Sequence, residues 1–87
     1  MKQYLQYKQM AKWGEKNCER GVYYYRHKRY KEARYYLANA YWTFNDMIAN
    51  FSQFMDPINL WRYKNIMDKI LNKIDKATAK EQEEACA

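Results

Sequence analysis

The chain has very little of the residue types that separate short structural elements. Its 87 residues include only two glycines and one proline. A fold built of several strands needs turn residues between those strands, so this scarcity excludes most all-β and α/β arrangements. Hydrophobic residues make up 48% of the chain and aromatic residues 18%, which is too rich for a disordered segment. We therefore expect one folded domain of the all-α class.

Residues that carry catalytic or metal chemistry are also scarce. The two cysteines, Cys18 and Cys86, lie far apart, and the one histidine, His27, stands among arginines and lysines with no carboxylate to orient it as a base. This set offers no zinc spacing, and no glycine-rich loop is present to hold a nucleotide. We expect a protein that is not an enzyme and that has no cofactor, no metal and no small-molecule substrate.

Long apolar runs are missing as well. No stretch approaches the roughly 20 apolar residues that span a bilayer, and the chain does not open with a charged start followed by an apolar segment. The third predicted helix is basic and amphipathic, but its apolar face is explained more simply by a helical core. The expectation is a soluble protein of a reducing, cytoplasmic compartment with no membrane partner.

What the sequence does contain is helical periodicity. Apolar residues recur at steps of three and four in three stretches, which predict helices over about 2–27, 30–55 and 57–80. Asp56 and Pro57 mark the start of the third helix, because Asp accepts backbone N–H groups at an N-cap and Pro suits the first helical position.

The junction between the first two helices carries no such signal. The run from Arg26 to Arg29 lacks glycine and proline, so we expect a short turn held by packing. The resulting prediction is an antiparallel three-helix bundle with a single domain over 1–80. A loosely ordered polar tail is expected over 81–87.

The stretch 21–44 holds the most regular pattern. It resembles one tetratricopeptide repeat, whose glycine, aromatic, alanine and large apolar positions match Gly21, Tyr24, Tyr30, Ala33, Leu37 and Ala40. The string Tyr30-x-x-Ala33-x-x-x-Leu37-x-x-Ala40-x-x-x-Phe44 is similar to the first hairpin of microtubule-interacting-and-transport domains, which are three-helix bundles. No second copy follows, and a solenoid needs about three. The resemblance implies a tetratricopeptide-like first hairpin, and an unrelated helical bundle remains the alternative.

The second predicted helix is apolar on more than its core side. Tyr35 and Trp42 lie outside its core stripe, and on the first helix Trp13 and Tyr24 form a second stripe beside the core. These aromatics have two possible roles. They widen the core, in which case the third helix covers part of this second side of the second helix, or they anchor a protein partner or a homodimer.

Basic charge is concentrated in the first part of the chain. Residues 1–34 hold ten Lys or Arg and three acidic residues, whereas residues 35–87 hold six and seven. Such an imbalance favours an acidic partner or nucleic acid, or serves only solubility.

These patterns predict a small protein–protein interaction module, an adaptor or inhibitor, with an aromatic and basic surface. The predicted partner-binding residues are Tyr35, Trp42, Trp13, Tyr24, Arg26, Arg29 and Arg34. The alternative is a nucleic-acid-binding protein whose basic hairpin tip, 26–34, contacts phosphates. The residues for that alternative are Arg26, Lys28, Arg29, Lys31 and Arg34.

Overall fold

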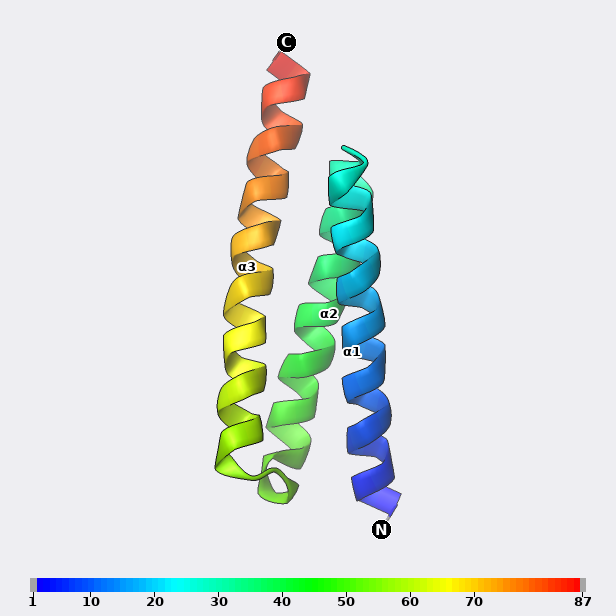
Figure 1. The fold of residues 1–87 in the computed structure, drawn as a ribbon, viewed down its shortest axis with the longest axis vertical. Helices are drawn as coiled ribbons and strands as arrows, with labels where there is room; N and C mark the ends of the chain where they lie inside the picture. Colours follow the sequence, from blue (N-terminus) through cyan, green and yellow to red (C-terminus); the bar gives the residue numbers. More distant parts are fainter. Residues whose placement is uncertain (1, 87) are drawn as a thin grey trace.

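A computed structural model describes residues 2–86, with side chains from residue 6 onward. This part of the chain forms the helices α1 (Lys2–Arg26), α2 (Tyr30–Phe51) and α3 (Pro57–Cys86), with a short 3-10 helix, η1 (Ser52–Phe54), before α3. The chain reverses direction after α1 and again after α2, as Figure 1 shows. No strand occurs over 2–86, which confirms the all-α class.

Helix α2 occupies the central position. It packs along both α1 and α3, whereas the backbones of α1 and α3 barely approach each other. The molecule is elongated, with principal extents of 52 × 19 × 16 Å. Its core follows from this order, because α2 supplies most of the side chains that have no exposed surface. These are Ala33, Leu37, Ala40, Phe44 and Met47.

The seam between α1 and α2 is built on two glycines. A methyl group placed on Gly14 would lie 2.6 Å from the Phe44 ring, and one on Gly21 would lie 2.6 Å from Leu37 Cγ. The two glycines are two helical turns apart on α1, and Leu37 and Phe44 are two turns apart on α2. Each large side chain of α2 therefore packs directly on the backbone of α1 at a glycine. Gly21 therefore lies directly against Leu37.

The turn between α1 and α2 closes with a Schellman motif. The amide of Arg29 donates to the Tyr24 carbonyl at 2.9 Å, and that of Lys28 donates to the Tyr25 carbonyl at 3.1 Å. The motif needs a left-handed residue, and Lys28 supplies it with φ of 60°. A lysine there costs about 1 kcal/mol relative to glycine, so packing of the helices must offset local strain.

The turn between α2 and α3 is encoded in the sequence. Asp56 Oδ1 accepts a hydrogen bond from the amide of Asn59 at 2.8 Å, which confirms the predicted N-cap. The Asn59 side chain returns a second bond to Asp56 Oδ2 at 3.1 Å. Pro57 is the first residue of α3, as predicted.

Two helix ends differ from the prediction. The α-helical part of α2 ends at Phe51 rather than near residue 55, because Met55 is both buried and extended and the chain must leave the helix earlier to reach that position. Helix α3 continues to Cys86 rather than ending near residue 80, since no glycine or proline interrupts it. Residues 81–86 are therefore helical, and Ala87 lies outside the described residues. The loose order predicted for residues 81–87 stays a prediction.

The seam between α2 and α3 uses larger side chains. Met67, Ile70 and Ala77 of α3 are buried, and the Phe44 and Tyr63 rings lie 5.4 Å apart. Near the far end, Arg34 Nη2 lies 2.6 Å from Glu81 Oε2, which ties α3 to the start of α2. Burial raises the pKa of the Tyr63 hydroxyl, with further contributions from Tyr7 and Glu15 of α1.

No helix in the described part of the chain is both long and apolar enough to cross a membrane.

Candidate functional site

Aromatic side chains are gathered, exposed, over α1 and α2. Trp13 is 68% exposed, Tyr35 63% and Trp42 59%. All three line one shallow groove of about 490 Å³ between the two helices. We call this surface the α1/α2 face. Its residues are Trp13, Asn17, Arg20, Tyr35, Tyr36, Asn39, Trp42, Thr43 and Asp46.

Helical geometry explains why these aromatics face solvent. Tyr35 and Trp42 are two turns apart on α2, on the side opposite the buried Leu37 and Phe44. Helix α3 packs elsewhere on α2 and leaves both side chains more than half exposed. The interpretation in which the third helix covers Tyr35 and Trp42 is therefore wrong. Trp13 likewise stays outside the core that it was alternatively expected to widen.

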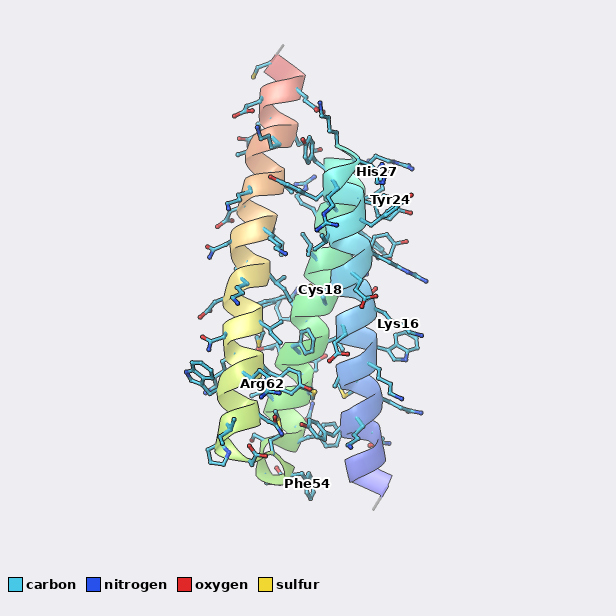
Figure 2. The ribbon with its side chains drawn as sticks, viewed as in Figure 1. Lys16, Cys18, Tyr24, His27, Phe54 and Arg62 are labelled. Carbon is cyan, nitrogen blue, oxygen red and sulfur yellow. The ribbon has the colours of Figure 1, made fainter. Side chains whose placement is uncertain are left out.

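A ladder of stacked rings and guanidinium groups continues the face toward the turn. The Tyr24 and Tyr36 rings are nearly parallel, at 11° and 5.4 Å between centroids. Arg29 lies 5.3 Å from the Tyr24 centroid and Arg20 lies 5.7 Å from the Tyr36 centroid. These cation–π contacts hold the rings in place and keep positive charge at the surface. Figure 2 shows Tyr24 and Lys16 on the side of α1 away from α3.

The predicted partner-binding residues left out Arg20 and Tyr36. The signal that could have found Arg20 is its position one helical turn before Tyr24, because residues four apart lie on the same side of a helix. Tyr36 gave no comparable signal, since it is visible as a partner only once α2 is packed on α1. Asp46, at the far end of the groove, adds one acidic group.

The structure separates the predicted cations. Arg34 points to α3 and pairs with Glu81, and Arg29 pairs with Glu32 at 3.3 Å between Nη2 and Oε1. Arg26 lines grooves between α1 and α3 rather than the α1/α2 face. Lys28 and Lys31 are exposed at the turn and at the start of α2. The seven predicted partner-binding residues thus divide, with Trp13, Tyr35 and Trp42 in one groove and Tyr24 and Arg29 adjoining it.

Glu32 stabilises the beginning of α2. Its own backbone amide, together with nearby Arg29 and Lys31, holds the pKa of the Glu32 carboxyl below its usual range. Because the pKa is lowered, the carboxylate stabilises the fold at a pH above its ordinary pKa. This stabilisation is lost as the pH falls through the lowered pKa. The same carboxylate engages Arg29, which leaves less of that guanidinium group for a ligand.

A second groove of about 640 Å³ runs between α1 and α3. Its walls carry Glu15, Glu19 and Tyr23 from α1 and Ile66 from α3, and it was not predicted. Cys18 lies in this groove, on the side of α1 toward α3 (Figure 2), and burial raises the pKa of its thiol. A raised pKa keeps the sulfur protonated, so Cys18 is a poor nucleophile.

The described residues contain no group of three His, Cys, Asp or Glu side chains placed to hold a metal ion. Comparisons with protein families, with curated proteins and with solved structures found no match to this chain. The geometry of the α1/α2 face is therefore the basis for assigning a function.

Proposed function

We propose that this chain is a small, non-enzymatic protein–protein interaction module of the adaptor or inhibitor type, and that it binds through the α1/α2 face. The observation that supports this most strongly is the convergence of Trp13, Tyr35 and Trp42, each more than half exposed, in one groove. Tryptophan, tyrosine and arginine are the residues that dominate binding energy in protein interfaces. Monomers seldom leave such residues gathered at the surface without a use.

Charge supplies the second part of the proposal. Arg20 lies over the Tyr36 ring and lines the groove, so the bound protein meets apolar rings edged with positive charge. Either an acidic partner protein or a second copy of this chain, which offers Asp46, could meet that edge, and the charge contributes mainly to the association rate. Two free cysteines support a reducing, cytoplasmic setting for this interaction.

The test compares two aromatic residues of the α1/α2 face with one exposed tryptophan outside it. Tagged protein is used to capture partners from cells that naturally produce it, and Tyr35→Ala with Trp42→Ala should lose those partners. Trp61→Ala is the matched control, because Trp61 is an exposed tryptophan on α3, away from the face. Circular dichroism should show all variants folded. Partners retained by the Tyr35 and Trp42 variants, or lost by the Trp61 variant, would contradict the proposal.

A second candidate function is nucleic-acid binding by the hairpin tip. Three cations of the tip are exposed and form no ion pair within the described residues: Arg26, Lys28 and Lys31. The exposed ring of Tyr23 lies 4.3 Å from the ring of His27. This candidate ranks second because Arg29 and Arg34 are engaged by carboxylates. The affinity for a labelled oligonucleotide should fall steeply with salt. A plot of the logarithm of the binding constant against the logarithm of the salt concentration should have a slope of about −0.7 to −0.9 per phosphate contacted. Unchanged binding after Arg26→Gln and Lys28→Gln would exclude it.

For the finer architecture, we propose an antiparallel three-helix bundle whose first hairpin packs as in a tetratricopeptide repeat. Support comes from Gly21 seated on Leu37 and from fully buried Ala33 and Ala40. Spin labels at Gln9 and Ala49, in a background lacking Cys18 and Cys86, should report a short distance. A long distance would contradict antiparallel packing of these two helices.

A further inference from the structure

The exposed stripe of α2 has a symmetry of its own. Lys31, Tyr35, Ala38, Trp42 and Asp46 recur at helical spacing, and all are exposed except Ala38, which is half-buried. Reversing the direction of the helix places Lys31 where Asp46 stands and Tyr35 where Trp42 stands, about a centre between Ala38 and the residue after it. The stripe is therefore complementary to a reversed copy of itself.

Resting on the proposed function, we propose that the protein bound at the α1/α2 face is a second copy of this chain, with α2 packed antiparallel on the other α2. A two-fold axis then passes beside Ala38. The contact is isologous, so every pairing occurs twice. Lys31 meets the second copy's Asp46, and Tyr35 meets the second copy's Trp42.

Charge selects this arrangement over the parallel one. A parallel pairing in register would set Lys31 against Lys31 and Asp46 against Asp46, which repel. Within the described residues neither Lys31 nor Asp46 forms an ion pair, so both charges are available to the second copy. Like-charge juxtaposition is an effective way to exclude a wrong arrangement.

Size and shape agree with the charge pattern. The stripe from Lys31 to Asp46 covers about 22 Å of helix at about 1.5 Å per residue. Ala38 at the crossing lets the two helices approach to the usual separation of about 8–10 Å between axes. Tyr35, Trp42 and Trp13 are each about 60% exposed, so with aromatic side chains of about 150–250 Å² they supply roughly 300–450 Å², about half of the roughly 800 Å² that each partner buries in a standard interface.

The decisive experiment is a charge exchange followed by analytical ultracentrifugation over a wide concentration range. Lys31→Asp alone sets the introduced carboxylate against the second copy's Asp46, and this repulsion occurs twice. Asp46→Lys alone sets the introduced ammonium group against the second copy's Lys31, again twice. Each variant should dimerise about tenfold more weakly, or worse.

Mixing the two variants restores the opposite charges. In the mixed dimer, the carboxylate of one variant faces the introduced ammonium group of the other at one end of the stripe, and Asp46 of the first faces Lys31 of the second at the other end. The mixture should therefore dimerise again. Failure of the mixture to dimerise better than either variant alone would overturn the inference.

Matched controls come from α3. Lys69→Asp and Asp68→Lys change net charge by the same amounts at exposed positions away from the stripe, and they should leave the dimer unchanged. Tyr35→Ala with Trp42→Ala should give a folded monomer. A wild-type protein that stays monomeric at the highest concentration, or an alanine variant that still dimerises, would overturn the inference.

The two proposals fail in different ways. If the wild-type protein is monomeric but the alanine variants still lose captured partners, only the inference of a second copy is wrong. If the wild-type protein is monomeric and the alanine variants keep every captured partner, the proposed function of the α1/α2 face fails with it.

Discussion

The first hairpin joins α1 to α2 through a turn with no glycine and a seam with two, whereas the second joins α2 to α3 through a well-encoded turn and a seam of larger side chains. At the first turn Lys28 takes a left-handed conformation, and the seam holds Phe44 and Leu37 directly on glycine backbone. At the second turn Asp56 caps α3, and the seam relies on residues such as Ile70 and on a charged pair. Close packing therefore specifies the first hairpin, and local backbone chemistry specifies the second.

The largest effect should come from disturbing the glycine seam. Gly14→Ala places a methyl group within 3 Å of three atoms of the buried Phe44 ring. Overpacking typically costs about 1–3 kcal/mol, and the gain in helix propensity offsets about 1 kcal/mol of it. We expect a net loss of up to about 2 kcal/mol in the free energy of unfolding, measured by urea denaturation.

A second background separates overpacking from any other effect of the alanine. In a Phe44→Leu protein the smaller side chain leaves room for the methyl group, so adding Gly14→Ala should be neutral or stabilising. The same loss in both backgrounds would mean that the glycine seam is not what limits the approach of α1 to α2.

The second turn should respond to loss of its cap. Asp56→Ala removes the acceptor for the Asn59 amide and should lower the free energy of unfolding by about 1 kcal/mol. Asp56→Asn keeps an acceptor oxygen and should retain most of the stability. If alanine and asparagine behaved alike, the cap would not be what specifies this turn.

The first turn should respond in the opposite direction. Lys28→Gly removes the side-chain strain of the left-handed conformation and should raise the free energy of unfolding by up to about 1 kcal/mol. Lys69→Gly, at an exposed position in the interior of α3, is the control and should destabilise by about 1 kcal/mol. Destabilisation by Lys28→Gly would show that the lysine side chain contributes more than its backbone costs.

The smallest effect belongs to the charged pair of the second seam. Arg34 and Glu81 are more than a third exposed, so Glu81→Gln should cost less than about 1 kcal/mol and nothing at high salt. Glu83→Gln, whose partner Lys80 lies on the same helix at 3.7 Å, gives the comparison. A loss that persists at high salt would indicate that the Arg34 contact with α3 is more than electrostatic.

Local sequence signals predicted the number and order of the helices better than they predicted where the helices end. The Asp56–Pro57 start of α3 was readable, because capping chemistry acts over a few residues. The end of α2 was misplaced because Met55 is held extended by burial, which depends on tertiary packing. The end of α3 was misplaced because charged residues continue a helix as readily as they form a tail.

The candidate site was predictable in its aromatics but not in its cations. The spacing of Tyr35 and Trp42 places them opposite the core whatever α1 and α3 do. Arg34 reads as a free surface cation because its partner, Glu81, comes from the far end of the chain. Arg20 and Tyr36 meet only when α1 and α2 are packed, so no spacing rule on one helix could pair them.

The placement of the tryptophans gives this protein an unusual optical behaviour. Trp13, Trp42 and Trp61 are the chain's three tryptophans, and each is more than half exposed in the folded state. Indole emission should therefore lie close to that of the unfolded chain, and denaturation should shift it little. Covering the α1/α2 face should instead move the emission of Trp13 and Trp42 to shorter wavelength while Trp61 stays unchanged. Fluorescence of this protein reports what is bound to it rather than whether it is folded.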